Sequence, residues 1–294
     1  MRDHFKLIIL IFSTVNIGLG QDVGQELFGF DYSTIQGIGD TSIEKYSIDT
    51  YLDTDYKKTN IGFGFIYDNY NFLFTNAPFY TGSELYTDLH TIGAKLSYTY
   101  LVNDTWSANL FVLPMISSDL EQKITNEDIV INAKATVTKK WGSGMNSSSL
   151  LLGIGYDTTF GVPQLIPLIS YQKRINLQWE YILGFPETYI NFHHNTRHII
   201  SAATAITGLY GNLSSPFYDE DIRMISNTKL TYKTAATSLE YKYRIQPHWT
   251  TVVKAGYSFY NELAILDKDH TTIYDFNTDS SFFITMGLKF NLNK

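Results

Sequence analysis

The chain has 294 residues and a net charge of −7, with 22 Tyr, 19 Phe, 4 Trp and no Cys. Without cysteine it forms neither disulfides nor thiolate metal sites, and it carries no lipid on an N-terminal cysteine. The acidic balance and the lack of a basic stripe argue against nucleic acid as a partner. Because Tyr, Phe, Trp and Thr suit a pleated surface, the composition favours an all-β fold.

The first element along the chain has the pattern of an export signal. Charged residues extend to Lys6, an apolar stretch follows over residues 7–15, and Gly18 and Gly20 precede Gln21. This order is typical of a cleaved secretory signal peptide, and a buried N-terminal strand or helix is the alternative. No later stretch reaches 18 consecutive apolar residues, so no transmembrane helix is expected.

Apolar and polar residues alternate along most of the remaining chain. In residues 128–141, one face carries Ile129 and Ile131 and the other carries Asn132 and Lys134. A period of two is typical of strands, and charges at every second position suit a face that lines water. We predict fourteen strands, at residues 25–36, 41–53, 58–73, 87–102, 105–118, 127–141, 148–160, 164–174, 176–185, 187–194, 197–211, 224–246, 249–264 and 280–292.

The lengths of the connections support this count. The long connections, 74–86, 119–126, 212–223 and 265–279, all follow odd-numbered strands, whereas the even-numbered strands are followed by shorter turns. Long loops at one end and short turns at the other are the layout of bacterial outer-membrane barrels. Splitting residues 224–246 into two strands would place the last long connection after an even-numbered strand, so we treat them as one strand with a bulge. Twelve strands is the alternative count.

The four tryptophans add an independent observation. Each lies beside a short turn and shares the parity of the apolar face: Trp106, Trp141, Trp179 and Trp249. Tryptophan prefers the boundary between lipid and water, where barrels carry aromatic girdles. We therefore predict that these four residues form an interfacial girdle.

The last strand carries a further pattern. Thr285, Gly287, Phe290 and Leu292 fit the order polar–x–Gly–x–x–hydrophobic–x–hydrophobic, which resembles the C-terminal assembly signal of Gram-negative outer-membrane barrels. Two residues follow Leu292, whereas many such proteins end on an aromatic residue. Over about residues 25–292 the chain resembles the uncharacterised, domain-of-unknown-function families of outer-membrane β-barrels, porin-like in type.

This resemblance and the alternation together predict an all-β, transmembrane antiparallel up-and-down β-barrel of about 14 strands. The expected parts are a signal peptide, residues 1–20, and an outer-membrane β-barrel, residues 21–294. The resemblance implies a place in the cell outer membrane, in contact with lipid and lipopolysaccharide, after insertion by the barrel-assembly machinery. It implies no catalytic residues.

Sites for metals and catalysis are weakly indicated. Residues 190–200 hold a histidine cluster, in which His193 and His194 point to opposite faces and His194 could approach His198 across a turn. A metal site would need a third ligand, and none is close in sequence. Neither a His-x-Ser pair, as in outer-membrane phospholipases, nor a G-x-S-x-G sequence occurs. We expect no enzyme, no cofactor and no metal, and we interpret the acidic stretches 119–128 and 266–279 as solvated loops.

Polar residues on the inward face are the candidates for a solute path. A barrel of about fourteen strands falls between the filled eight-stranded and the open sixteen-stranded type. Both signs of charge are mixed, so strong ion selectivity is not expected. The lumen-lining candidates are Lys95, Asn132, Lys134, Asp157, Gln178, Glu180, Glu240, Lys242, Arg244, Lys254 and Lys289.

Two functions remain open at this point. The first is a channel or porin-like passage for small solutes, and the second is a closed structural or binding barrel that acts through its long outer loops. A path for long-chain hydrophobic substrates ranks below both, because residues 21–40 are too short for a convincing plug.

Overall fold

The computed structural model describes residues 25–74, 88–142, 146–215, 217–218 and 224–292. The predicted signal peptide lies outside these ranges, as do residues 75–87 of the first long loop. Within the described ranges, no helix has the length and apolar character that crossing a membrane requires.

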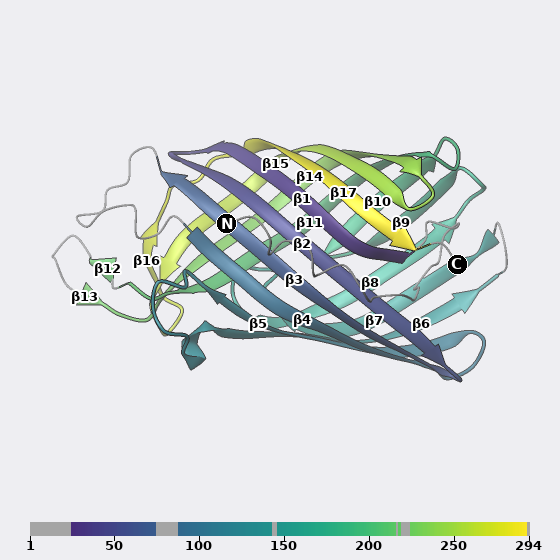
Figure 1. Ribbon diagram of the computed structural model, residues 1–294, viewed down its shortest axis with the longest axis horizontal. Coiled ribbons are helices and arrows are strands. Elements are labelled where there is room, and N and C mark those ends of the chain that lie inside the picture. Colours follow the sequence, from purple (N-terminus) through teal and green to yellow (C-terminus); the bar gives the residue numbers. More distant parts are fainter. Residues whose placement is uncertain (1–24, 75–87, 143–145, 216, 219–223, 293–294) are drawn as a thin grey trace, which may run out of the picture.

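Long antiparallel strands make up nearly the whole structure (Figure 1). They are β1 (Gln25–Ile38), β2 (Thr41–Tyr56), β3 (Thr59–Phe74), β4 (Asp88–Leu101), β5 (Trp106–Ser118), β6 (Ile129–Trp141), β7 (Ser148–Asp157), β8 (Gln164–Arg174), β9 (Trp179–Phe185), β10 (Glu187–His193), β11 (His198–Leu213), β14 (Thr228–Gln246), β15 (Trp249–Leu266) and β17 (Ser281–Leu292). Each pairs with the next long strand, and β1 pairs with β17 to close the ring. The predicted fold, an up-and-down barrel of 14 strands, is confirmed.

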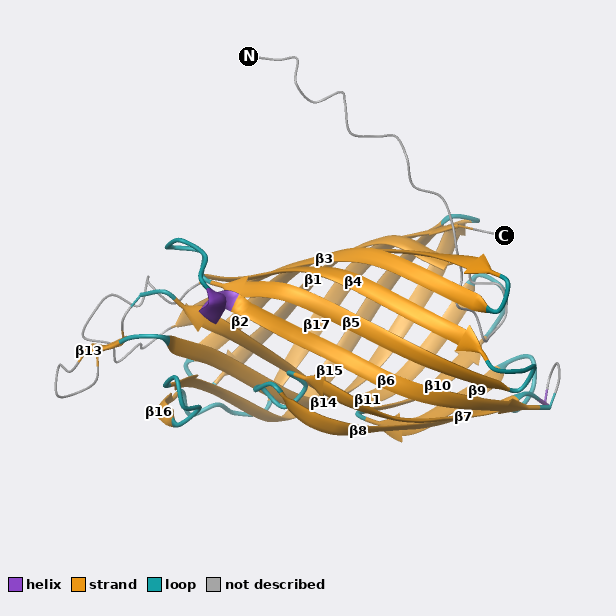
Figure 2. Cartoon of the chain, turned by 90° about the horizontal axis from the view of Figure 1, so that it is seen from below, coloured by secondary structure: helices purple, strands orange, loops and turns teal. Residues whose placement is uncertain are grey.

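The two ends of the barrel differ, as Figures 1 and 2 show. One end, called here the short-turn end, carries the tight turns after even-numbered strands and the ends of β1 and β17. The other, the long-loop end, carries the short strands β12 (Phe217–Tyr218), β13 (Met224–Ile225) and β16 (Thr272–Asp275) and the 3-10 turn η2 (Asn126–Asp128). The predicted division into long loops and short turns therefore matches the structure.

The structure differs from the prediction in the segment 224–246. Met224–Ile225 is a separate short strand that pairs with β12, and β14 begins only at Thr228. Asn227 breaks the strand, because its φ of 60° lies in the left-handed region. The bulge is in β15 instead, where Phe259 is the extra residue opposite Ala235 and Ala236.

The outer surface of the barrel is an apolar belt. Leu152 on β7 is 50% exposed, its partner Val137 on β6 is 45% exposed, and Phe282 on β17 is 74% exposed. Successive side chains of a strand point to opposite faces, so the alternation in the sequence puts one apolar row per strand on the outside. An exposed apolar surface of this extent is typical of a lipid-facing wall.

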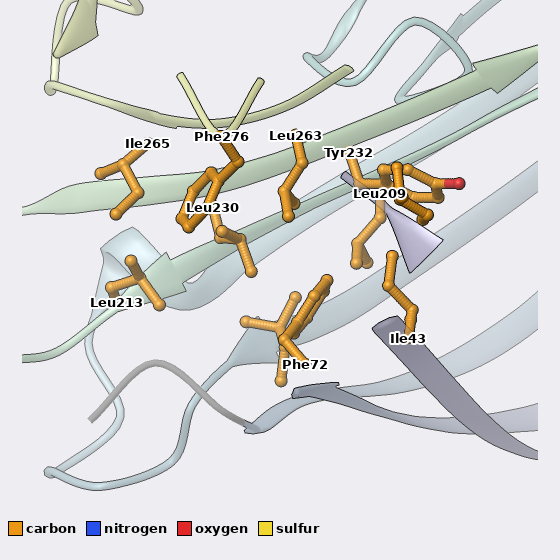
Figure 3. Packing of buried hydrophobic residues seen from close by; sticks show 11 residues of the cluster. Ile43, Phe72, Leu209, Leu213, Leu230, Tyr232, Leu263, Ile265 and Phe276 are labelled. Atoms are coloured by element: carbon orange, nitrogen blue, oxygen red, sulfur yellow. The ribbon is translucent and has the colours of Figure 1, made fainter. Parts of the chain in front are cut away.

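Inside the long-loop end, the barrel is filled with apolar side chains, called here the apolar plug (Figure 3). Its buried members are Ile38, Ile43, Phe72, Leu89, Leu209, Leu213, Leu230, Tyr232, Leu263, Ile265 and Phe276. Most come from inward positions of β2, β3, β4, β11, β14 and β15, and Phe276 comes from the loop before β17. Burial of so many apolar groups excludes water from this end of the lumen.

The part of β11 at the long-loop end crosses the interior of the barrel instead of staying in the wall. Asn212 of β11 pairs in parallel with Ser118 of β5, although five strands, β6 to β10, separate β11 from β5 along that side of the ring. Tyr210 and Leu209 point to opposite faces of β11, yet both are buried. The long-loop end is therefore pinched, and the lumen is accessible mainly from the short-turn end.

Candidate functional site

The lumen near the short-turn end contains a polar cavity of about 390 Å³. It lies between β1, β2, β14, β15 and β17, and ion pairs hold its wall. The ammonium of Lys289 lies 2.5 Å from Asp31 Oδ2 and 3.0 Å from Glu26 Oε1. Lys242 Nζ lies 3.0 Å from Glu240 Oε1. Cations and carboxylates thus neutralise one another while they face water.

A second cavity, of about 240 Å³, continues towards the apolar plug. It shares Ser33, Lys45, Lys254 and Thr285 with the first cavity, so the two form successive parts of one space. Ile43 belongs both to its lining and to the plug. The lumen therefore changes from polar to apolar along the barrel axis.

A third cavity, of about 440 Å³, occupies the opposite side of the lumen, against β5 to β10. Lys134 of β6 lies 3.1 Å from Asp157 of β7, and the hydroxyl groups of Tyr51 and Ser97 are 2.5 Å apart. Leu168 and Ile182 add apolar surface near the turn between β9 and β10. This cavity is called here the β9 pocket, and its lining is mixed.

The structure brings most of the predicted lumen residues to the inside of the barrel. Lys95 forms an ion pair with Asp49, and Glu180 accepts a hydrogen bond of 2.6 Å from Gln172. The residues at inward positions of their strands are Lys95, Asn132, Lys134, Asp157, Glu180, Glu240, Lys242, Arg244, Lys254 and Lys289. Whether any of them lines a solute path stays a prediction.

Gln178 differs from the other candidates, because it lies in the turn between β8 and β9. The side-chain oxygen of Asn176 accepts hydrogen bonds from the backbone N–H groups of Gln178 and Trp179, both at 2.8 Å. This Asx turn delays the start of β9 to Trp179. Gln178 is therefore an exposed residue at the mouth of the barrel.

Among the lumen residues that the sequence analysis missed are Asp31, Lys45, Asp49 and Asp68. Lys45 lies 3.1 Å from Asp68 and 4.8 Å from the centre of the Tyr70 ring. These residues lie at inward positions of β1, β2 and β3, strands from which the sequence analysis took no lumen candidates. The alternation is weak in β2, where Glu44 and Thr50 make the outward face partly polar, so periodicity alone does not identify its inward face.

A buried polar cluster, called here the latch, ties β11 to β5 and η2 at the long-loop end. Asn212 donates a hydrogen bond of 2.8 Å to Asp128, and Lys229 donates one of 2.9 Å to Asn212. Lys229 also lies 2.8 Å from Glu127 Oε2. Asp119 accepts hydrogen bonds of 2.8 and 2.7 Å from the backbone and hydroxyl of Ser214. The latch holds the pinched end together across the barrel.

Asp128 is the titratable centre of the latch. Its burial raises the pKa of the carboxyl group, but hydrogen bonds from Ser118, Thr125 and Asn212 stabilise the carboxylate more strongly. The net effect is a pKa below the usual value for aspartate. The latch therefore contains a carboxylate that stays charged in mildly acidic solution.

The histidines do not converge. His193 faces the lumen, 4.0 Å from Glu180, whereas His198 stacks on Tyr241 on the outside. The rings of His194 and His198 are 6.3 Å apart and nearly perpendicular. In the ranges that the structure describes, no group of three or more histidine, cysteine or acidic residues is placed to hold a metal ion.

The four tryptophans all lie at the short-turn end of their strands. Trp106, Trp179 and Trp249 begin β5, β9 and β15, and Trp141 ends β6. The first three in chain order are each about 40% exposed, and Trp249 is half-buried. Their role as an interfacial girdle remains a prediction.

The residues of the predicted assembly signal lie in the closing strand. Thr285 faces the lumen, where its hydroxyl lies 2.8 Å from that of Ser33, and Gly287 pairs with Asp31. Phe290 packs against Trp249 at 5.0 Å between ring centroids. Leu292 ends the strand opposite Gln25. The geometry gives each residue a place in the seam of the barrel, while the role of an assembly signal is untested.

A closed ring of tilted strands, an apolar outer belt and a polar lumen together define a transmembrane β-barrel of the porin-like type. A sequence family matches most of this ring, over residues 45–291. The chain belongs to that family, which is described as Domain of unknown function (DUF6268).

Other comparisons add little beyond the fold. Curated protein sequences contain no match to the chain. Solved structures that resemble it include the NanC porin, with a TM-score of 0.39, 9% identity, and coverage of 90% of this chain and 100% of that one. The toluene transporter TbuX of Ralstonia pickettii gives a TM-score of 0.39 and 9% identity, with 91% and 88% coverage. Scores this low establish no functional relationship.

Proposed function

We propose that this protein is an outer-membrane channel for small solutes. The single observation that carries the proposal is the pair of connected cavities in a polar lumen, enclosed by a wall whose outer face is apolar. Such a wall buries apolar residues in lipid while the inward residues stay hydrated. Mixed and mutually paired charges favour neutral or weakly charged solutes over one class of ion.

The apolar plug makes the long-loop end the gate of this channel. Hydrophobic constrictions prevent conduction by excluding water, so the arrangement described here corresponds to a closed state. Opening requires that β11, β14 and β15 move away from β3 and β4 at the long-loop end. The latch residues Asp128, Asn212 and Lys229 oppose that movement.

A closed structural or binding barrel is the second candidate. The ion pairs Lys95–Asp49, Lys45–Asp68 and Lys134–Asp157 favour it, because paired charges fill a lumen without creating a continuous path for water. In that case the function would lie in the loops at the long-loop end. We assign no reaction and no cofactor to either candidate.

Localisation and biogenesis follow from the same proposal. Residues 1–20 would direct export and be removed, and Thr285, Gly287, Phe290 and Leu292 would be read by the barrel-assembly machinery. The short-turn end would then face the periplasm, with the long loops among lipopolysaccharide at the cell surface. The apolar belt supports a membrane location, and no basic stripe suggests nucleic acid.

Single-channel recording in planar bilayers tests the proposal. We compare the wild type with the double variant Phe72→Ala, Leu263→Ala, which removes two fully buried side chains from the apolar plug. The variant is expected to show larger or more frequent openings, because a wider constriction admits water more readily. The matched control is Leu152→Ala, Ile154→Ala on the outer belt, which leaves the plug intact.

Two results would favour the closed barrel over the channel. One is an absence of conductance in both the wild type and the plug variant, measured on protein that is inserted and heat-modifiable on gels. The other is an absence of arabinose uptake by proteoliposomes that contain the plug variant. Either result in properly folded protein contradicts solute passage along the axis.

A further inference from the structure

The wall of the barrel is interrupted between β8 and β11. The strands β9 and β10 between them have seven residues each and lie towards the short-turn end (Figure 1). Pairing of β8 with β9 ends at Ile169 and Phe185, although β8 starts at Gln164. Pairing of β10 with β11 ends at Ala205, although β11 continues to Leu213. Beyond the turn at Pro186, therefore, no strand connects β8 to β11.

This interruption falls at the depth of the lipid. A strand tilted by about 40° advances about 2.5 Å per residue along the barrel axis. Trp179 begins β9 at the short-turn end, like the other tryptophans, so Pro186, seven residues further on, lies about 18 Å above that level. The apolar band of such barrels is about 25 Å tall. The turn at Pro186 thus lies inside the band.

The free edge of β8 is adapted to the missing neighbour. Arg174 donates its backbone N–H to Ser147 on the β7 side, and N–H groups alternate along a strand, so the N–H groups of odd-numbered residues point towards β9. Pro167 is odd-numbered and has no N–H, so the edge lacks a donor where β9 ends. Open edges in lipid are tolerated only where their polar groups are covered or absent.

The β9–β10 turn covers part of the edge of β11, and the β7–β8 loop covers one of its faces. Ile206 donates its backbone N–H to the carbonyl of Pro186 at 3.1 Å. Further along, a Cβ at Gly208 would overlap the carbonyl oxygen of Thr158, so the loop between β7 and β8 lies directly against β11. Thr231 donates a hydrogen bond of 2.5 Å to the carbonyl of Gly161 in the same loop. An opening is left between the β8 edge, this loop and the Pro186 turn.

The β9 pocket extends into this opening. Its lining includes Leu168, which faces inwards and is 8% exposed, and Ile169, which faces outwards and is 48% exposed. Ile169 is the last residue of β8 that pairs with β9, so the cavity reaches β8 where its edge becomes free. Phe185 and Pro186 at the tip of the β9–β10 hairpin also line it. The pocket therefore extends from the lumen to the place where the wall is interrupted.

The polarity of the pocket changes from the opening to the lumen. Ile169, Phe185 and Pro186 lie at the opening beside the exposed Glu187, whereas Tyr51, Asn109 and Lys134 form the deeper wall. The charge of Lys134 is balanced by Asp157 at 3.1 Å. Phe160 of the β7–β8 loop stacks on Phe185 with 6.0 Å between ring centroids, so an aromatic pair partly covers the opening. A volume of about 440 Å³ is in the range of small-molecule sites.

We propose that this opening is a lateral window through which small, uncharged amphipathic molecules pass between the lumen and the bilayer. The proposal rests on the proposed function as a channel and names a second exit for it. The apolar plug blocks the axis, whereas the aromatic pair Phe160–Phe185 partly covers the window. A solute with an apolar body and a hydrogen-bonding head matches the gradient of polarity in the β9 pocket.

Single-cysteine variants test the window, because the chain has no native cysteine. Ile182→Cys places a thiol in the β9 pocket, Ser47→Cys places one in the polar cavity, and Ile154→Cys places one on the outer belt. Each variant in lipid vesicles is treated with pyrenylmaleimide, which partitions into bilayers, and with sulfonatoethyl methanethiosulfonate, which stays in water. We expect Ile182→Cys to react with both reagents, Ser47→Cys only with the sulfonate and Ile154→Cys only with pyrenylmaleimide.

Opening the window should increase access from the lipid. Adding Phe160→Ala to Ile182→Cys is expected to raise the rate with pyrenylmaleimide several-fold and to leave the rate of Ser47→Cys unchanged. The window is contradicted if pyrenylmaleimide modifies Ile182→Cys no faster than Ser47→Cys, with or without Phe160→Ala. If Ser47→Cys does not react with the sulfonate, the proposal of a water-filled channel is wrong. This result is independent of the comparison that tests the window.

Protection by a ligand tests the proposed class of solute. The probe is 1-naphthol, which has an apolar ring system and one hydroxyl group, and glycerol is the polar control. We expect 1-naphthol to slow the reaction of Ile182→Cys with the sulfonate in a saturable manner, with no effect on Ser47→Cys. Equal protection by glycerol, or no protection by 1-naphthol, would overturn the assignment of an amphipathic solute.

Discussion

Three turns at the short-turn end use one asparagine in the same way. In the turns before Trp106, Trp179 and His198, the side-chain oxygen of Asn103, Asn176 or Asn195 accepts two backbone hydrogen bonds of 2.8–3.0 Å. The backbone of each asparagine also donates towards the first residue of the next strand. A short polar side chain thus replaces the ladder where the chain reverses. The position of each tryptophan or histidine is set by this local rule.

Replacing Asn176 with alanine should lower the free energy of unfolding by about 1 kcal/mol, as for the loss of a capping side chain. The reason is that the N–H groups of Gln178 and Trp179 lose their acceptor. Asn176→Asp keeps the acceptor oxygen and is the matched control. Urea unfolding of vesicle-inserted protein, followed by tryptophan fluorescence, measures the difference. Equal destabilisation by both substitutions would show that the Asx turn is not the cause.

The latch predicts a pH dependence at Asp128. Its pKa in the folded state lies below the unfolded value of about 3.9. A lowered pKa contributes stability that is fully present above the unfolded pKa and is lost as the pH falls through the folded pKa. The wild type should therefore exceed Asp128→Asn in stability by a constant amount from about pH 7 to 5, and the gap should shrink below about pH 4. Unfolding curves at each pH measure it; a gap that stays constant to pH 3 contradicts the assignment.

At the level of elements, the sequence predicted what depends on local alternation. All fourteen long strands were identified, because most of them show the period of two that a half-exposed sheet imposes. The inward course of β11 was not predicted. Around residues 209–213 and 263–266 the alternation disappears, since both faces are buried there. That loss is a signal for a segment that leaves the wall, but it does not tell which strand lies opposite.

Ion pairs between strands could not be predicted from the sequence for a related reason. Lys95 meets Asp49 because β3 lies between β4 and β2 in a particular register, and Lys134 meets Asp157 through the register of β6 with β7. A single strand shows which residues face inwards, whereas partners depend on the offset between strands. Candidate lumen residues were therefore found, but their pairing was not.

The contact between β11 and the β7–β8 loop gives a prediction for an element. A Cβ at Gly208 would overlap backbone atoms of Thr158 and Gly161, which cannot move aside like the end of a side chain. Gly208→Ala should displace the loop and lower the free energy of unfolding by about 1–3 kcal/mol. At Gly155 the nearest atom to an added Cβ is Ile166 Cγ1 at 3.2 Å, so Gly155→Ala should be tolerated. Urea unfolding compares the two, and a neutral Gly208→Ala would contradict the close approach.

At the level of the whole molecule, three zones follow one another along the axis. The short-turn end carries the four tryptophans, the middle has an apolar belt around a polar lumen, and the long-loop end is filled by the apolar plug. Lys139 is a charged residue on the outer face, and its ammonium lies over the Trp106 ring at 5.2 Å. A cation is tolerated on a lipid-facing wall if it can reach water, so we propose that Trp106 and Lys139 lie at the level of the lipid boundary.

This boundary predicts how each outward position tolerates a charge. Val137 precedes Trp141 by four residues along β6 and pairs with Leu152, which places Leu152 about 10 Å from the boundary and near the middle of the band. Leu152→Arg should therefore lower the free energy of unfolding by about 2–4 kcal/mol, whereas the change at the boundary itself is only about 0–1 kcal/mol.

Tyr100→Arg is the matched control, because Tyr100 is similarly exposed and lies one residue from the end of β4, close to the level of Trp106. Reversible unfolding in phospholipid vesicles measures both variants, and repeating it in detergent micelles separates depth in the bilayer from loss of packing. In vesicles, a lower free energy of unfolding for Leu152→Arg than for Tyr100→Arg fixes the membrane position of the short-turn end. If the free energy of unfolding falls equally in both variants, the tryptophans do not lie at the lipid boundary. The depth assigned to the Pro186 turn is then wrong as well.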